Sequence, residues 1–244
     1  MEAQGAQSYI FSSDRPMTWN AAGIDRAFGF DNFYMGDVLD LPDPTVTIPA
    51  DGELYHRIAD ILPTLDGWEE GGKAFGMTVT LTGHTPFTFT PEEEQYEIAG
   101  DYPQWLKNII VTTTYVDKSL EYFINYLHTL PDADKTIIAI TGDHEGMASL
   151  RNELDFNSCP FVDRGKHTPL ILINSPYTGR DSTAIGQVDV YSALLDAAGL
   201  YNNAKWKGMG FSPFAPKNEL YKEHTDSAQY ISNLMLRNSI PPTK

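Results

Sequence analysis

The sequence is poor in cysteine, in basic residues and in long apolar runs. Its single cysteine, Cys159, excludes an intramolecular disulfide framework. It has 17 basic against 33 acidic residues, and the net charge of −16 argues against nonspecific binding to nucleic acid or to an anionic lipid surface. The longest clean apolar run, Leu170–Ile173, is far too short to span a membrane. The first residues show neither the basic nor the apolar segment of a signal peptide.

The chain has enough apolar residues to fold around a core. With 244 residues, of which 41% are hydrophobic, it is too apolar for intrinsic disorder. We expect one domain over residues 1–244, with a core over about 6–216 and a tail over 217–244. The negative charge does not exclude a small anionic substrate, because a bound cation can reverse the local field.

Strand patterns alternate with helix patterns along most of the chain. Strands are expected at Ser8–Phe11, Phe75–Leu81, Thr136–Ile140 and Leu170–Ile173, and helices at Thr18–Phe28, Glu53–Leu65, Trp105–Leu127 and Val188–Leu200. Thr18 or Asn20 is a plausible cap for the first helix. The unbroken apolar runs suit strands covered on both faces. The order predicts an α/β fold with a largely parallel sheet and helices on both faces, whose ligands bind after the strands.

A candidate metal site follows the strand Thr136–Ile140. Asp143 and His144 lie between Gly142 and Gly146 and offer a carboxylate oxygen and an imidazole nitrogen. The glycines let the backbone bend, so that two adjacent side chains can converge on one ion. From spacing alone, a polar turn with a capping aspartate is the better interpretation.

Other polar residues lie near the expected strands, each with a structural alternative. His84 follows Phe75–Leu81 and is a ligand candidate or a histidine bonded within a turn before proline. A cluster of cationic residues, Arg164, Lys166 and His167, precedes Leu170–Ile173, and solvated charge is its favoured interpretation. Asp14 and Trp19 follow the first strand and could hold a polyol, although a helix cap and a core aromatic are favoured by spacing.

Other catalytic motifs are missing from the sequence. It contains no glycine-rich phosphate loop after a strand, no Gly-x-Ser-x-Gly elbow, no His-Glu-x-x-His and no Cys-x-x-Cys. Cys159 has no activating neighbour and is expected to be inert.

Taken in order, five segments resemble the sulfatase/alkaline-phosphatase superfamily, and within it the lipoteichoic-acid-synthase-type phosphoglycerol transferases and their sulfatase-like bacterial relatives. The segments are Ser8–Asn20 with Phe28–Tyr34, Leu81–Phe87, Tyr115–Asp117, Thr141–Gly146, and His167–Ile171 with Gly186–Asp189 and Leu194–Leu200. Each motif alone is weak, and their order over residues 8–200 makes the match specific.

The resemblance implies a role for each matching residue. Asp143 and His144 would bind one divalent metal ion, for which oxygen and nitrogen ligands admit Mn, Mg, Ca or Zn. His84 would contact the phosphate or glycerol group of an anionic phosphate or sulfate ester, and Asp14 and Trp19 would line its pocket. Phosphoglycerol transferases carry an arginine where this chain has Ala21, so Arg15 becomes a substrate-binding candidate, together with His167.

The resemblance also implies what the chain does not supply. The family's catalytic threonine and a further acidic metal ligand lie before the Trp-Asn passage, so we expect the C-terminal portion of a catalytic domain that is inactive alone. Its parent would act at the extracytoplasmic face of the membrane, held there by an N-terminal segment. The first strand would lack one partner and expose an edge through which the chain could self-associate.

Two other interpretations remain open at this stage. The chain could be a noncatalytic module that binds a glycan or a lipid headgroup, or a structural domain in which Asp143 and His144 form only a turn. Phosphate and sulfate chemistry are not distinguished by the residues.

Overall fold

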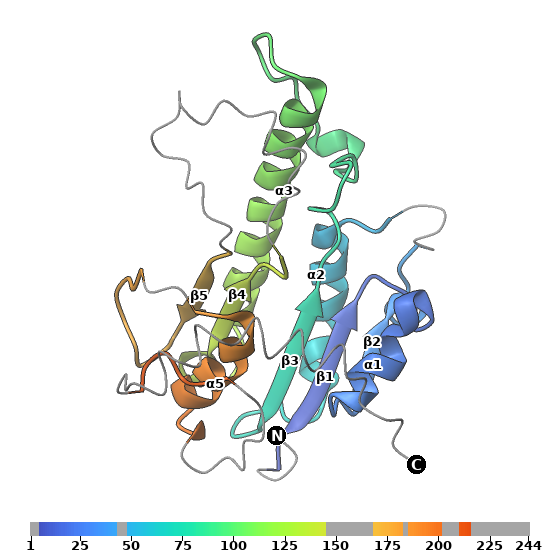
Figure 1. The fold of residues 1–244 in the computed structure, drawn as a ribbon. Coiled ribbons are helices and arrows are strands. Elements are labelled where there is room, and N and C mark those ends of the chain that lie inside the picture. The colour runs from blue at the N-terminus through green and yellow to red at the C-terminus, as the bar shows by residue number, and fades with distance from the viewer. Residues whose placement is uncertain (1–4, 43–47, 145–167, 183–184, 202–209, 216–244) are drawn as a thin grey trace, which may run out of the picture. The chain divides into compact units, whose positions relative to one another are not determined.

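The computed structural model describes residues 5–42, 48–144, 168–182, 185–201 and 210–215 (Figure 1). The chain divides into two compact units, residues 1–134 and residues 135–244. Each unit is described by itself. The single domain expected over 1–244 stays a prediction, whereas the parallel sheet with helices confirms the expected α/β class.

Unit 1 is built on a three-stranded parallel sheet in the order β2-β1-β3. Strand β1 (Gln7–Ser12) pairs on one side with β2 (Asn32–Met35) and on the other with β3 (Ala74–Val79), so that Ile10 lies between Phe33 and Met77. All residues of β1 after Gln7 are buried, as is typical of a central strand covered on both faces.

Two features of this sheet were not expected from the sequence. Strand β2 is short, follows a glycine turn and has no clear alternation, so its pattern did not identify it. Because β2 and β3 both belong to this chain, β1 has both of its partners, and the prediction that the first strand exposes an edge is wrong. In the described sheet the edges are β2 and β3. Self-association therefore stays an untested prediction.

Helix α1 (Ala21–Ala27) follows a 3-10 turn at Thr18–Asn20. Asn20 stands at the N-cap position as predicted, but it has a left-handed φ of 57° and its side chain makes no capping hydrogen bond. Its amide lies instead against Gly23, where an added Cβ would come within 2.6 Å of Oδ1. The predicted position of the cap is therefore confirmed for Asn20, but its side chain lies beside Gly23 and makes no capping hydrogen bond.

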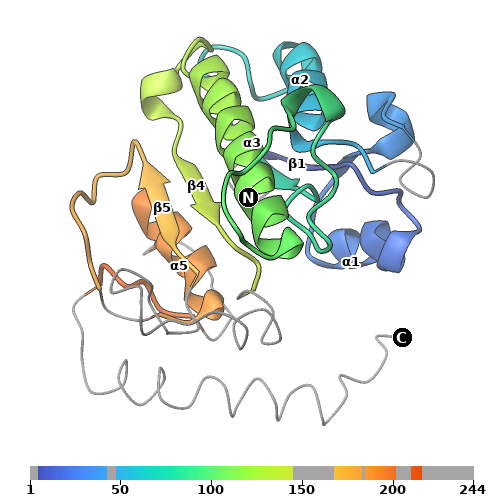
Figure 2. The ribbon, with the colours of Figure 1, turned by 90° about the horizontal axis from the view of Figure 1, so that it is seen from above.

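Helices α2 (Asp51–Ile61) and α3 (Gln104–Leu127) pack on each other. The rings of Tyr55 and Phe123 stack with centroids 4.7 Å apart, and the Tyr126 hydroxyl donates to the Ala59 carbonyl at 2.6 Å. Pro103 precedes α3 at its N-cap, in agreement with the predicted start. Seen from above, α1 and α2 lie on opposite sides of β1, so helices cover both faces (Figure 2).

Unit 2 contains β4 (Ile138–Thr141), β5 (Leu170–Ile173) and α5 (Gln187–Ala197). The two strands pair antiparallel, with Ile140 opposite Ile171. The prediction that these apolar runs are covered on both faces is wrong for β5, because Ile171 is 48% exposed. An antiparallel pair can keep one face in water, whereas a central parallel strand cannot.

Within the described ranges, no helix has both the length and the apolar character needed to cross a membrane.

Candidate functional site

The candidate substrate residues of unit 1 lie just beyond the carboxyl ends of the parallel strands. Asp14 and Arg15 follow β1, Asp37 follows β2, and His84 lies on the 81–87 loop, which comes after β3. Because the three strands are parallel, their carboxyl ends lie together at one end of the sheet, which is where ligands bind in open α/β folds. The structure thus places these residues where the sequence predicted that a ligand would bind, and their binding roles stay predictions.

Asp14 is half-buried, and its backbone N–H donates to Ser12 Oγ at 3.1 Å. In the part of the chain that the structure describes, its carboxylate accepts no hydrogen bond and forms no ion pair. Burial alone raises the pKa of this carboxyl above its usual value. The neighbouring Ser13 hydroxyl is also buried without a hydrogen-bond partner among the described residues. Groups left unsatisfied in this way are often used by a ligand.

The raised pKa of Asp14 predicts how its replacement changes stability with pH. Ionisation is less favourable in the fold than in the unfolded chain, so the negative charge costs stability above the carboxyl's usual pKa of about 4, and the cost disappears in more acidic solution. We expect Asp14→Asn to raise the free energy of unfolding by less than about 0.5 kcal/mol at pH near 7, because the group is partly exposed to screening solvent.

Thermal unfolding at pH near 7 and near 3.5 measures this difference. The matched control is Asp101→Asn, which removes an exposed carboxylate of the same unit and is expected to change stability little at either pH. A variant at Asp14 that is less stable than the wild type at neutral pH would contradict the prediction.

Arg15 is held at the same end of the sheet by a residue that the sequence had not indicated. Its guanidinium Nη2 lies 3.6 Å from Asp37 Oδ1, with side-chain exposures of 40% and 72%. A pair this exposed contributes little to stability. Arg15 and Asp37 follow the adjacent strands β1 and β2, so the pair joins the segments that leave these two strands. The pairing also places a negative charge beside the cation that would meet an anionic substrate.

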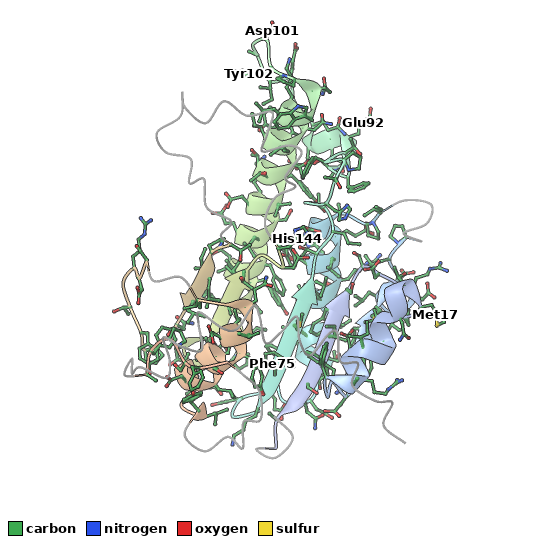
Figure 3. The ribbon with its side chains drawn as sticks, in the orientation of Figure 1. Met17, Phe75, Glu92, Asp101, Tyr102 and His144 are labelled. Atoms are coloured by element: carbon green, nitrogen blue, oxygen red, sulfur yellow. The ribbon has the colours of Figure 1, made fainter. Side chains whose placement is uncertain are left out.

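Trp19 lies in the 3-10 turn Thr18–Asn20, between the end of β1 and the start of α1. Ala21 begins α1, so the position at which phosphoglycerol transferases carry an arginine is the first residue of this helix. Met17, just before the turn, is 86% exposed (Figure 3).

His84 is exposed, and one of its ring nitrogens is already used. Nδ1 lies 2.7 Å from the Thr85 carbonyl oxygen. A carbonyl can only accept, so Nδ1 carries the proton and Nε2 is left for another partner. The turn interpretation of this histidine is confirmed, since it is bonded before the cis Thr85–Pro86 peptide. Its role as a ligand stays a prediction, which the second ring nitrogen leaves possible.

In unit 2, Asp143 and His144 follow β4, and Figure 3 labels His144. Asp143 Oδ1 accepts from the His144 backbone N–H at 2.9 Å, and Asp143 Oδ2 lies 3.6 Å from His144 Nε2. Both side chains are largely exposed, at 88% and 68%. Two ligands of one tetrahedral ion, bound at about 2.1 Å each, lie roughly 3.4 Å apart, so this pair fits half of a metal site.

The part of the chain that the structure describes adds no third candidate ligand to this pair. Among the described residues, no group of three or more His, Cys, Asp or Glu side chains could hold an ion. His167, the remaining candidate, lies outside the described residues. Its predicted role stays a prediction, as does the metal-ligand role of Asp143 and His144.

Two residues that sequence reasoning gave no role support the Asp143–His144 turn. Gln187, the first residue of α5, donates from its side-chain amide to the carbonyls of Gly142 and Asp143. Asp189 is buried at 1% exposure and accepts from the backbone N–H groups of Gly186 and Phe211, which anchors the start of α5. In the sequence, both residues were noted only as part of the segment Gly186–Asp189, which contributes to the family resemblance but was given no role.

Comparison with known proteins gives three concordant results. The sequence profile described as "Sulfatase" matches residues 2–200. The lipoteichoic acid synthase of Staphylococcus saprophyticus is 27% identical over 238 residues, which cover 94% of this chain and 35% of that protein. The lipoteichoic acid synthase of Staphylococcus aureus strain USA300 is 25% identical over 209 residues, covering 82% and 31%. The chain thus spans about a third of the length of these curated relatives.

Solved structures share the fold. The lipoteichoic acid synthase LtaP of Listeria monocytogenes superposes with a TM-score of 0.62 at 19% identity, over 82% of this chain and 51% of that one. The Streptococcus pyogenes phosphoglycerol transferase GacH, solved with sn-glycerol-1-phosphate, gives a TM-score of 0.54 at 16% identity, over 93% and 60%. At these identities the structures establish the fold alone.

Proposed function

Because the chain belongs to the sulfatase family, we propose that it forms the substrate-binding part and half of the metal site of a divalent-metal-dependent phosphoglycerol transferase. The observation that carries the proposal is the placement of Asp14, Arg15 and His84 after parallel strands at one end of the sheet. The relatives named as lipoteichoic acid synthases and as a phosphoglycerol transferase favour a phosphate ester over a sulfate ester.

In this proposal each side chain has a separate task. His84 Nε2 donates to a phosphate oxygen when the ring is protonated, since Nδ1 is engaged with the Thr85 carbonyl. Arg15 adds a second positive charge, and the Asp14 carboxylate accepts hydrogen bonds from the glycerol hydroxyls. Trp19, which follows the same strand as Asp14 and Arg15, is a further candidate for this pocket. The substrate-binding role of His167, which lies outside the described residues, stays a separate prediction. The ester thus meets cations on its phosphate and an acceptor on its polyol.

Asp143 and His144 would hold the divalent ion. Bound there with further ligands, the ion would polarise the phosphorus–oxygen centre and stabilise the charge that develops during transfer. The Gln187 amide holds the backbone carbonyls of the same turn, so that the two side chains start from a fixed position. The donor set, one carboxylate oxygen and one imidazole nitrogen, suits Mn or Zn better than Ca.

We assign the nucleophile to no residue of this chain. The family resemblance places it before the Trp-Asn passage, and we propose that the chain alone binds the ester and does not turn it over. The parent protein would work at the extracytoplasmic face of the membrane. Metal-dependent turnover of a phosphoglycerol lipid or an aryl phosphate by residues 1–244 would contradict this part of the proposal.

Titration of the chain with sn-glycerol-1-phosphate, followed by nuclear magnetic resonance in the presence of Mg²⁺, tests the substrate assignment. We expect weak, saturable binding that falls about tenfold in His84→Ala, because a charge-assisted hydrogen bond contributes about 1.5 kcal/mol or more. His56→Ala is the matched control, since His56 is an exposed histidine on α2. Equal affinities for the two variants, or no binding by the wild type, would contradict the assignment.

A further inference from the structure

The 81–87 loop presents an exposed histidine, yet it is held by fully buried groups. Within the loop, the His84 backbone N–H donates to the Leu81 carbonyl at 2.9 Å, and the Phe87 N–H donates to the His84 carbonyl at 3.0 Å. These two turns form around His84 and fix its backbone relative to the ends of the loop. The position of His84 therefore depends on what holds those ends.

The beginning of the loop is bound to Asp51 at the start of α2. Asp51 Oδ1 accepts from the backbone N–H groups of Leu81 and Thr82 at 3.0 and 2.9 Å. In return, the Asp51 backbone N–H donates to Thr82 Oγ1 at 2.7 Å. Asp51 and Thr82 are 1% and 0% exposed, so water competes poorly with these three bonds.

The end of the loop is bound to α3. Thr112 Oγ1 donates to the Phe87 carbonyl oxygen at 3.1 Å, and the Thr112 side chain is 1% exposed. Both ends of the loop are therefore fixed by buried hydroxyl or carboxylate groups that belong to helices α2 and α3.

The start of α2 is in turn fixed to α3 by Tyr115. The Gly52 backbone N–H donates to the Tyr115 hydroxyl at 3.1 Å. A Cβ at position 52 would lie 2.6 Å from that hydroxyl and 3.1 Å from Ser119 Oγ, so only glycine permits the approach. Tyr115 belongs to the Tyr115–Asp117 segment, which carried part of the family resemblance without a role.

Resting on the proposed function, we propose that Asp51 is a positioning residue for His84, and that Tyr115 fixes Asp51 through Gly52. Asp51 is the first residue of α2, whose N-cap is Ala50, so its carboxylate does not stand at the cap of its own helix. Its Oδ1 instead accepts from two successive amides of another segment. Its removal would release the beginning of the 81–87 loop and with it the bond between His84 Nδ1 and the Thr85 carbonyl. The ring would then lose its fixed tautomer.

The imidazole nitrogen shifts of His84 test this inference, with His84→Gln used to assign its signals. In the wild type the ring is expected to carry its proton on Nδ1. In Asp51→Ala we expect a mixture of tautomers and about a tenfold lower affinity for sn-glycerol-1-phosphate, the loss typical of removing a residue that orients a ligand. Asp51→Asn keeps an Oδ1 acceptor and is expected to retain the wild-type tautomer.

Leu54→Ala is the control for general loss of stability, since Leu54 is 0% exposed on the same helix and makes no hydrogen bond to the 81–87 loop. If Asp51→Ala does not fold, Thr82→Val, which removes only the Oγ1 acceptor, is compared with Thr82→Ser. An unchanged tautomer in folded Asp51→Ala or Thr82→Val, or an equal change in Leu54→Ala, would overturn the inference.

The nuclear magnetic resonance readout does not depend on ligand binding. If the wild type fails to bind sn-glycerol-1-phosphate, the proposed function is contradicted, while the tautomer of His84 still decides whether Asp51 positions the ring. A tautomer that changes only in Asp51→Ala supports the inference in either case.

Discussion

Replacing Asp143 by alanine is expected to lower the affinity of the chain for Mn²⁺ or Zn²⁺ at least tenfold. The variant removes one of the two proposed ligands, whose Oδ2 and Nε2 atoms lie 3.6 Å apart, and leaves a single exposed imidazole. One imidazole in water holds such an ion weakly, and the loss of a group that merely orients a ligand already costs about 10- to 100-fold. Equilibrium dialysis or calorimetry with each ion measures the effect.

Asp101→Ala is the matched control for this experiment, because it removes the same charge from an exposed position in unit 1. The wild-type affinity is expected to rise with pH as the imidazole loses its proton, because a metal ligand must be deprotonated. Equal ion binding by Asp143→Ala and the wild type would show that these residues form only a polar turn. The proposed metal site would then be abandoned.

Phe11→Ala is expected to destabilise the fold by about 3–5 kcal/mol. Phe11 lies on the central strand β1 and is 2% exposed. The centroid of its ring lies 5.7 Å from that of Tyr34, and the ring packs against Gly76, where an added Cβ would lie 3.4 Å from Cε2. Since neighbours on both β2 and β3 pack against it, the cavity cannot close without moving a strand. For a chain of this size, the melting temperature should fall by about 10 °C.

Urea unfolding followed by circular dichroism measures the loss, and an unchanged m-value would show that the folded and unfolded states are otherwise the same. Phe28→Ala deletes the same ring from a position that is 78% exposed and is expected to change stability by less than about 0.5 kcal/mol. Similar losses for the two variants would mean that β1 is not the centre of the core.

The sequence predicted the positions of helices and strands better than it predicted which strands pair with each other. The apolar spacing of residues 105–127 located α3 within a residue or two, because a long helix repeats its signal many times. Strand β2 has only four residues and was not identified from its pattern. The prediction that β1 has an exposed edge was wrong, because strand pairing depends on which distant segments come together. The residues of one strand do not indicate which other strands pair with it.

For the candidate site, too, the sequence indicated candidate residues but not the residues that contact them. Asp14 and His84 became candidates because they follow expected strands and match the family resemblance, and their roles stay predictions. The supporting contacts were not predicted: Asp37 contacts Arg15, Asp51 binds the 81–87 loop, and Gln187 binds the turn at Gly142 and Asp143. An acidic residue at the start of a helix looks the same in sequence whether it caps that helix or binds another loop.

The position of β1 between two parallel partners also constrains how unit 1 can assemble. Gln7 pairs with Ala74, so the central strand cannot be flanked on both sides until the chain has been made as far as Val79. Parallel pairings of this kind require long crossovers to close first and slow the folding reaction. During synthesis, the apolar residues of β1 would therefore stay uncovered for longer than any others in the sheet. This interval is when a chaperone would be most useful to the chain.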